Sequence, residues 1–297
     1  MGPNQPTITT RYGDDIMIWN LQQPRPDALF RYDDAGERFY GRVVNGNVWW
    51  YPSVTKIIKA TSPTPPGLMA WYAKHGFDEA NKLRDDAAER GTEMHVLFER
   101  YMSGQFVDMT SLSEFHAKAL MSFDQWYRDY EVEPLAVEVL LHSDTYGYAG
   151  TADLVCRIKG GKVILVDFKS GSSVYDDYAV QLEMYRLAWN EHADMHDIPQ
   201  VTETFNWLPK DWRKGPTYTF KDQTGECTSQ AIEYRCKLYN ETQKTSPRIK
   251  TIYGGTLPGE ATIEVVDPAQ VILDAHARLN RNEIDIDDET AFSVGHS

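Results

Sequence analysis

Residues 150–171 read as two β-strands joined by a short glycine turn, and this segment constrains the fold more than any other. The first strand carries Asp153, and the second carries Asp167 and Lys169. Both strands are rich in Val, Ile and Leu on both faces, so we expect burial in a sheet; the alternative is an ordinary hairpin with solvated acids. Buried carboxylates need partners. Two acids beside one ammonium can hold a divalent cation next to a phosphate, so the segment predicts metal-assisted phosphodiester hydrolysis.

The length of the turn decides whether the two acids face the same side of the sheet. Side chains alternate along a strand, so a two-residue Gly160–Gly161 turn would place Asp153 and Asp167 on opposite faces. A three-residue loop at 159–161, with a glycine at positive φ, would pair the two acids directly. A bulge beside Asp153 would have the same effect. We expect one of these two arrangements, because carboxylates on opposite faces would exclude a shared metal site.

Composition limits the class of protein. The 297 residues suffice for one large domain or one domain with additions. No apolar run approaches the roughly 20 residues of a membrane span, and the polar start predicts no signal peptide. The three cysteines are scattered, which predicts a reducing cytosol and excludes a four-cysteine iron–sulfur cluster within one chain. They are Cys156, Cys227 and Cys236.

The charge distribution neither requires nor excludes a nucleic-acid ligand. A formal charge of −14 argues against a sequence-independent nucleic-acid binder. Basic residues nevertheless gather at 210–214 and 244–250, whereas acids concentrate at 283–289 near the end of the chain. A local positive groove can therefore coexist with an acidic whole, and a bound metal would add positive charge at the phosphate.

The apolar periodicity predicts a single α/β domain with a mixed sheet and an N-terminal elaboration. Ser53 is a candidate N-cap for the first helix. The pattern weakens beyond Thr251, and we expect the acidic end after Arg281 to be mobile. Helices are predicted at residues 54–60, 68–90, 90–102, 113–130, 175–190 and 225–242. A β-ribbon is predicted at 31–51, and further strands at 135–141, 150–171, 201–208 and 217–220.

Four more residues are candidates for the same site. Glu138 interrupts an apolar strand, so it either meets a cation or lies on an edge strand facing water. His95 borders the apolar stripe of a helix, where a histidine is usually structural but can be a metal ligand. Gln181 and Tyr185 lie one turn apart on the helix after Lys169. They could reach a phosphate, or Tyr185 could simply pack in the core.

Three pairs of neighbouring aromatic residues could stack on nucleobases. Such residues are more often part of the core, so we expect at least one member of a pair on a strand to be buried. The pairs are Trp49–Trp50, Trp71–Tyr72 and Trp126–Tyr127.

In this order the motifs resemble those of the PD-(D/E)XK nuclease superfamily, in particular its RecB-like exonuclease branch. That branch includes phage recombination exonucleases, CRISPR-adaptation nucleases and the mitochondrial genome maintenance exonuclease. The resemblance covers about residues 51–208. Each motif alone is weak, whereas five in order are specific. They are G-T-x-x-H at Gly91–His95, Glu138 on a strand, G-T-A-D at Gly150–Asp153, D-F-K-S-G at Asp167–Gly171 and Q-x-x-x-Y at Gln181–Tyr185.

The resemblance implies a restriction-endonuclease-like α/β core, with a mixed central sheet flanked by helices, and a role for each motif residue. It implies an N-terminal β-ribbon extension at 1–52, a nuclease domain with a helical arch at 53–250, and an acidic, partly mobile extension at 251–297. The implied metal ligands are His95, Asp153, Asp167 and the carbonyl of Phe168. The implied catalytic residues are Asp153, Asp167, Lys169, Gln181, Tyr185 and, as an auxiliary acid, Glu138.

These implications lead to one predicted activity, a DNA exonuclease that depends on Mg²⁺ or Mn²⁺ and acts on single-stranded ends. The helices at 68–102 could arch over the site and select free ends. Many relatives carry four cysteines for an iron–sulfur cluster, which this chain lacks, so we expect no cluster. A structure-specific endonuclease with the same site, or a non-catalytic DNA- or protein-binding module, are the alternatives. We expect the substrate to be single-stranded or duplex DNA ends and a recombination or replication protein to be a further partner. We expect no membrane association and a location in the cytoplasm of a bacterial or phage-infected cell. The oligomeric state stays open.

Overall fold

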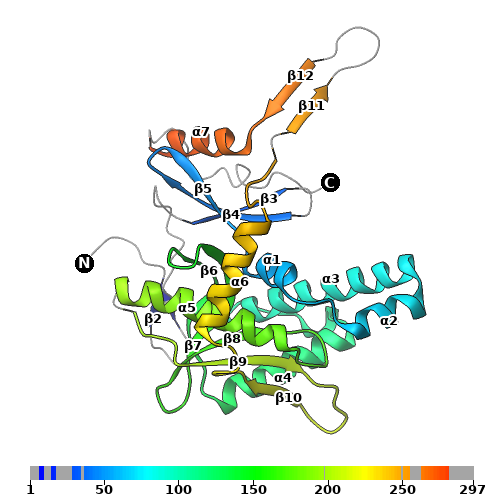
Figure 1. The fold of residues 1–297 in the computed structure, drawn as a ribbon. Helices are drawn as coiled ribbons and strands as arrows, with labels where there is room; N and C mark the ends of the chain where they lie inside the picture. The colour runs from blue at the N-terminus through cyan, green and yellow to red at the C-terminus, as the bar shows by residue number, and fades with distance from the viewer. Residues whose placement is uncertain are drawn as a thin grey trace.

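A five-stranded mixed sheet forms the centre of the protein, as the sequence predicts. The computed structural model describes residues 7–9, 15–17, 29–34, 37–196, 198–248, 250–254 and 262–280. The strand order is β10-β9-β8-β7-β6, and all neighbours are antiparallel except β8 and β9, which are parallel (Figure 1). The strands are β6 (Glu133–Ser143), β7 (Tyr148–Arg157), β8 (Val163–Phe168), β9 (Glu203–Pro209) and β10 (Tyr218–Asp222).

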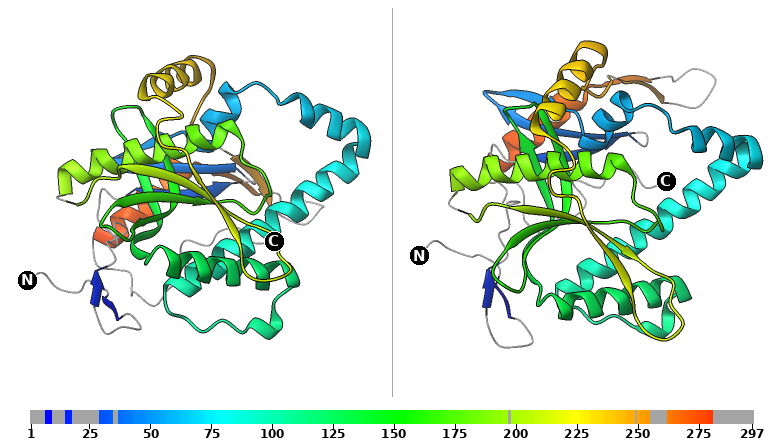
Figure 2. Two further views of the ribbon diagram at one scale, coloured as in Figure 1. Left: turned by 90° about the horizontal axis from the view of Figure 1, so that it is seen from below. Right: turned by 60° about the horizontal axis from the view of Figure 1, so that its bottom comes forward.

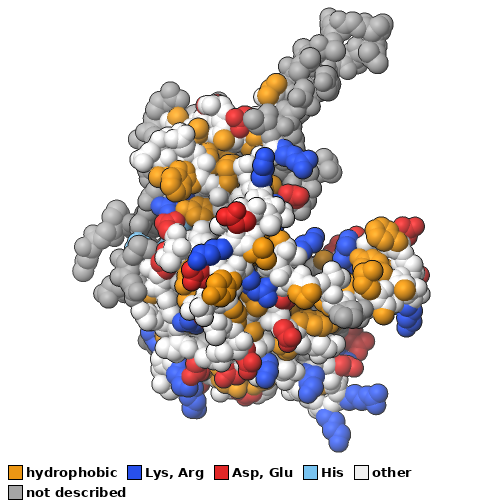
Figure 3. All heavy atoms as spheres, in the orientation of Figure 1, with side chains coloured by type: hydrophobic (Ala, Val, Ile, Leu, Met, Phe, Trp, Pro, Cys, Tyr) orange, Lys and Arg blue, Asp and Glu red, His pale blue; other side chains and the backbone are white. Residues whose placement is uncertain are grey.

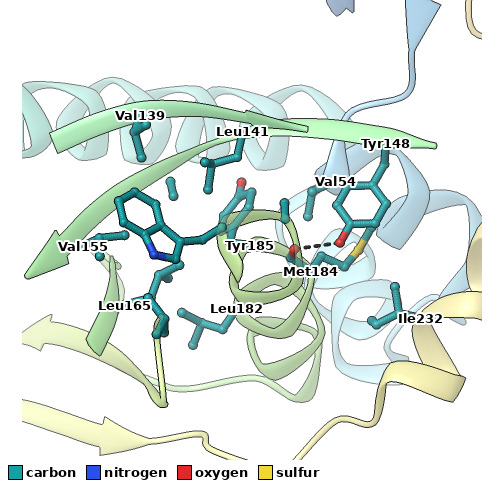
Figure 4. Close-up of a cluster of buried hydrophobic side chains, with 14 of the residues drawn as sticks. Val54, Val139, Leu141, Tyr148, Val155, Leu165, Leu182, Met184, Tyr185 and Ile232 are labelled. Carbon is teal, nitrogen blue, oxygen red and sulfur yellow. Dashed lines mark hydrogen bonds between the residues drawn. The ribbon is translucent and has the colours of Figure 1, made fainter. Parts of the chain in front are cut away.

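Helices cover both faces of this sheet, and each face has its own hydrophobic cluster (Figure 2). Helices α1, α5 and α6 pack on one face, where Figure 4 shows Tyr185 among apolar side chains and the Tyr148 hydroxyl donating to the Met184 carbonyl. On the other face lie α3 and α4, whose Phe98 and Phe123 rings stack with centroids 4.1 Å apart. The helices are α1 (Val54–Thr61), α3 (Phe77–Met102), α4 (Glu114–Asp129), α5 (Asp176–His196) and α6 (Ser229–Thr242).

A second, three-stranded antiparallel sheet precedes the core and confirms the predicted ribbon. Its last turn, at Asn45–Gly46, has positive φ at both residues, as a tight hairpin requires. The Tyr40 hydroxyl lies 3.0 Å from Thr151 Oγ1 and attaches this sheet to β7. The strands are β3 (Phe30–Asp34), β4 (Glu37–Val44) and β5 (Asn47–Tyr51), and a separate pair is formed by β1 (Thr7–Thr9) and β2 (Asp15–Met17).

Ser53 caps α1 as predicted, because its Oγ accepts a hydrogen bond from the Lys56 backbone N–H at 3.1 Å. The following helices differ from the prediction. Helix α2 (Pro66–His75) ends at Gly76, whose φ of 77° breaks the helix, and α3 then runs without a break through Gly91. A Cβ on Gly91 would lie 3.0 Å from Ser170 Oγ, so this glycine permits close approach of the loop after β8 and does not end a helix.

The helices α2 and α3 form a hairpin that projects from the body of the protein, which we call the α2–α3 arm (Figures 1 and 2). Figure 3 shows hydrophobic side chains gathered at its tip. Phe77, beside the turn between the two helices, is 72% exposed, and Met69 of α2 is 64% exposed. Between the arm's end and α4 lies a short 3-10 helix, η1 (Met109–Ser111).

The C-terminal region contains more structure than the weak sequence pattern predicts. Two short antiparallel strands and a helix follow α6. The acidic stretch at 283–289, for which we predict mobility, lies outside the described residues. The elements are β11 (Lys250–Gly254), β12 (Thr262–Val266) and α7 (Pro268–Asn280).

The expectation for the aromatic pair on a strand is wrong, and the two helical pairs differ, because Trp71 and Tyr72 of α2 are both partly exposed. Trp126 is fully buried in the cluster between the sheet and α4. On β5, Trp49 is 59% exposed and Trp50 is half-buried, so neither member of that pair belongs to the buried core. A three-stranded sheet at the margin of the molecule has too little cover to bury both faces.

Gly150 of the G-T-A-D motif is required by packing. A Cβ at this position would lie 2.7 Å from Cε1 of Tyr185 and 3.2 Å from Cγ2 of Val54. We expect Gly150→Ala to lower the free energy of unfolding by about 1–3 kcal/mol, because neither neighbour can move away within a packed core. Denaturant unfolding measures the change. Gly215→Ala is the control, since a Cβ there meets nothing within 4 Å; equal stability of the two variants would contradict the packing argument.

Candidate active site

The hairpin of β7 and β8 has the register that a shared site needs. Its pairs run from Leu154 opposite Val166 to Arg157 opposite Val163. The Ile158 N–H donates to the Lys162 carbonyl at 3.0 Å, which closes a loop at 159–161. Both glycines of this loop have positive φ, 88° and 82°. The predicted three-residue loop is therefore confirmed, and the register continued by one residue places Asp153 opposite Asp167.

The acids belong to a polar row that crosses neighbouring strands. On β6, the pairs on either side of Glu138 place it opposite Asp153 of β7. On the other side, Asp167 of β8 pairs with Asn206 of β9. Carboxylates on three adjacent strands therefore lie at one level of the sheet, in a fold that otherwise fills these strands with apolar residues.

The backbone at Glu138 has a conformation that is rare in a strand. Its φ is 47°, a left-handed value that costs about 1–3 kcal/mol for a residue other than glycine. In a regular strand Val137 and Val139 would point to the same face of the sheet. Here Val137 packs with the cluster under α3 and α4, whereas Val139 packs with the cluster under α5 on the other face. The site thus lies at the boundary between the two cores, where helices from both layers can reach it.

His95 of α3 approaches the acids from one layer. Its Nδ1 lies 3.5 Å from Glu138 Oε1 and 3.6 Å from Asp153 Oδ1, and its Nε2 lies 3.0 Å from the Phe168 carbonyl oxygen. One ligand atom from each of His95, Glu138 and Asp153 can lie within 4.8 Å of the others. Both alternatives for Glu138 hold in part: β6 is the edge strand of the sheet and Glu138 is partly exposed, but its carboxylate faces His95.

Asp167 lies beside this group of three and is held by other partners. Lys169 Nζ lies 2.8 Å from its Oδ2 and 3.1 Å from its Oδ1, and Asn206 Nδ2 donates to Oδ2 at 2.9 Å. Asp153 is connected to the same strand, because its Oδ2 accepts from the Phe168 N–H at 2.7 Å. The structure therefore brings His95, Glu138 and Asp153 together as one cluster, with Asp167 next to it and paired to Lys169.

Gln181 and Tyr185 reach the site from α5, in the other helical layer. Lys169 Nζ donates to Gln181 Oε1 at 2.8 Å, and Gln181 Nε2 donates to the Tyr185 hydroxyl at 3.2 Å. Lys169 also lies 4.5 Å from the ring centroid of Tyr178. Tyr185 is 4% exposed, so its ring packs in the core as the second alternative predicts, while its hydroxyl accepts a hydrogen bond from Gln181.

The proximity of the acids determines the protonation of the site. Burial disfavours the imidazolium of His95, but Asp153 and Glu138 outweigh burial and raise its pKa to about 9. Burial raises the pKa of Asp153 to about 7; His95 opposes this shift, and Asp167 and Glu138 add to it. Burial also opposes the ammonium of Lys169, yet Asp167 and Asp153 raise its pKa. Lys169 therefore stays charged at neutral pH.

These groups predict how stability depends on pH and metal. Folded His95 has a pKa of about 9, above the unfolded value near 6.5, so the stability from its proton is complete below about pH 6.5 and lost through pH 9. Folded Asp153 has a pKa of about 7, above its unfolded value near 4. The stability that its bound proton contributes is therefore complete below about pH 4 and is lost as the pH rises to about 7. We expect the Tm of the metal-free protein to fall as the pH rises from about 6 to about 9. Over the same range the rise in Tm caused by Mn²⁺ should grow, because an ion bound to His95 and Asp153 would replace the protons on both. Differential scanning fluorimetry in EDTA and in Mn²⁺ measures both; a Mn²⁺ effect that shrinks with rising pH would contradict the argument.

Comparison with known families agrees with this geometry. A family model for the PD-(D/E)XK nuclease superfamily matches residues 68–253, more than half of the chain. The chain belongs to the PD-(D/E)XK nuclease superfamily. No curated protein matches it. The superfamily consists of nucleases that use divalent metals, and the residues of this PD-(D/E)XK chain fit such an ion: they offer carboxylate oxygens, one imidazole and a backbone carbonyl beside it. Within the described residues no helix of this PD-(D/E)XK protein is long and apolar enough to cross a membrane.

Two polar residues of this PD-(D/E)XK site are not predicted by the sequence motifs. Asn206 and Gln223 are buried and continue the polar row behind Asp167. Asn206 leaves a weak signal in the sequence, because it interrupts an apolar stretch between Phe205 and Trp207. Gln223 follows β10 in a polar turn and leaves none.

Proposed function

We propose that the protein is a DNA exonuclease of the RecB-like branch, that it depends on Mg²⁺ or Mn²⁺, and that it degrades DNA from single-stranded ends. The observation that carries this proposal is the convergence of His95, Glu138 and Asp153 next to an Asp167–Lys169 pair. The DNA substrate agrees with membership of the nuclease superfamily. The retention of every acid and of the lysine argues against a non-catalytic binding module.

His95, Asp153, Asp167 and the Phe168 carbonyl would hold the ion, with Glu138 as an auxiliary acid. When bound, a divalent ion supplies a Lewis acid that lowers the pKa of water and neutralises phosphate charge. Glu138 and Asp153 face the same imidazole, which holds that side of the site together.

Lys169 has the properties that stabilisation of a phosphate requires. It stays charged, it is mostly buried, and two partners fix its position, the carboxylate of Asp167 and the amide oxygen of Gln181. The Tyr185 hydroxyl accepts from the other end of that amide, so the oxygen of Gln181 points at the ammonium. We assign Lys169 the stabilisation of negative charge that builds on the phosphate oxygens, and Gln181 and Tyr185 its orientation.

The α2–α3 arm supports the preference for ends. Its helix α3 carries His95 near its C-terminal end, so the arm is rigidly connected to the site. The arm projects from the body of the protein (Figures 1 and 2). The exposed side chains of Phe77 at its tip and Met69 on α2 offer apolar surface on which bases of an unpaired strand can stack or pack. The domain limits at residues 52 and 250, the cytoplasmic location and a recombination or replication partner belong to the same proposal.

Digestion of four substrates tests the proposal: closed circular and linear DNA, each as single and double strand, with Mn²⁺, with Mg²⁺ and with EDTA. We expect metal-dependent release of short products from linear single strands and no cleavage of either circle. Cleavage of closed circles would reject the exonuclease and favour an endonuclease with the same residues. No cleavage of any substrate in either metal would reject the nuclease assignment for this chain.

A further inference from the structure

Two buried amides form a hydrogen-bonded relay behind Asp167. Asn206 Nδ2 donates to Asp167 Oδ2 at 2.9 Å, and Gln223 Nε2 donates to Asn206 Oδ1 at 3.0 Å. Asn206 is fully buried and Gln223 is 7% exposed. The backbone N–H of Gln223 donates to the Thr204 carbonyl at 2.9 Å, so the outer end of the relay is attached to β9. The relay therefore spans from the loop after β10 to the carboxylate on β8.

The relay has only one consistent orientation. The ionised carboxylate of Asp167 accepts hydrogen bonds and cannot donate, so Asn206 must turn its NH₂ group towards it. The amide oxygen of Asn206 then faces Gln223, which must also present its NH₂ group. A chain of two amides with a fixed direction thus ends on one oxygen of the carboxylate.

We propose that Asn206 and Gln223 are positioning residues that set the rotation of the Asp167 carboxylate for binding of a divalent metal. The inference rests on the proposed function in one respect, namely that Asp167 is a metal ligand. Lys169 contacts both oxygens of Asp167, so its ammonium would compete with a metal ion for them. A neutral donor on Oδ2 from a second direction fixes the rotation of the carboxylate without cancelling its negative charge. Hydrogen-bonded partners of metal ligands typically change metal affinity about 10- to 100-fold when they are removed.

Substitutions along the relay test this assignment through direct metal binding. Asn206→Leu removes the donor to Asp167, and Gln223→Leu frees the amide of Asn206 to turn. Gln223→Glu keeps shape but replaces the donor by an acceptor, which favours an inverted Asn206 with its oxygen towards Asp167. Asn190→Leu is the matched control, because the amide of Asn190 on α5 makes its two hydrogen bonds to the backbone of Val201 and takes no part in the relay. Isothermal titration calorimetry with Mn²⁺ gives the affinity, and hydrolysis rates as a function of Mn²⁺ concentration give the separate effect on activity.

We expect Asn206→Leu and Gln223→Glu to weaken Mn²⁺ binding about 10- to 100-fold, Gln223→Leu to weaken it less, and Asn190→Leu to leave it unchanged. Far-UV circular dichroism establishes folding, and if Asn206→Leu does not fold, the two Gln223 variants decide the question. Folded Gln223 variants with wild-type Mn²⁺ affinity would overturn the relay even if the wild type cleaves DNA. A wild type that binds Mn²⁺ in a relay-dependent way but cleaves no DNA would overturn the proposed function alone, whereas one that binds no Mn²⁺ would overturn both.

Discussion

Lys169→Met is expected to lower the rate of DNA hydrolysis by about 10²–10³-fold, the typical loss when one positioned electrostatic stabiliser is removed. The methionine keeps the length and most of the packing of the lysine stem. It removes the charge that Asp167 and Gln181 hold in place. The ammonium also competes with a metal for Asp167, so Mn²⁺ binding should be unchanged or tighter in the variant. Single-turnover hydrolysis of an end-labelled oligonucleotide measures the first effect, and calorimetry measures the second.

A suitable control is Lys159→Met, at the exposed loop of the same hairpin, where the lysine pairs with Glu131. It should hydrolyse DNA at the wild-type rate. If Lys169→Met were as active as this control, Lys169 would have no role in the reaction. If it instead lost Mn²⁺ binding together with activity, Lys169 would act through the metal site rather than on the phosphate.

Asp153→Ala is expected to abolish both Mn²⁺ binding and hydrolysis, with a loss of about 10³-fold or more in rate. Asp153 occupies the middle of the polar row, faces His95 through Oδ1 and accepts from the Phe168 N–H through Oδ2. Its removal eliminates one oxygen ligand and releases the strand end that carries Asp167 and Lys169. The several kcal/mol that a metal contributes as a Lewis acid correspond to this loss in rate at about 1.4 kcal/mol per factor of ten.

The two substitutions should separate binding from chemistry. Asp153→Ala should lose the Mn²⁺-induced rise in Tm, whereas Lys169→Met should retain it. Asp211→Asn is the control for the acid, because Asp211 is exposed and pairs with Lys118 away from the polar row. A persistent Mn²⁺ effect in Asp153→Ala would mean that the ion binds elsewhere, and the assignment of the site would fail.

The placement of the motif residues could be predicted from the sequence because it depends on short-range periodicity. The length of the turn between Asp153 and Asp167 decides whether the two carboxylates lie on the same face of the sheet or on opposite faces. The structure has the register that places them on the same face. The same holds for Gln181 and Tyr185, since a helix places residues four apart on one face. Local rules of this kind need no knowledge of the tertiary structure.

Features that depend on contacts between distant segments could not be predicted in this way. The sequence predicts a boundary between two helices at Arg90, whereas α3 runs on through Gly91, which packs against Ser170. The relay joins Gln223 to Asn206, which lies on a different strand, so no local pattern connects them. The left-handed backbone of Glu138 is equally invisible, because glutamate has no intrinsic preference for that conformation.

That backbone conformation has a consequence outside catalysis. The strand β6 is the last in the order of the five-stranded sheet, and an outer strand with regular geometry can recruit a strand from a second molecule and begin aggregation. A local distortion in such a strand prevents this association, because the partner's hydrogen bonds cannot continue past it. The left-handed residue at Glu138 is such a distortion, and it lies at the same point of β6 as the acidic cluster.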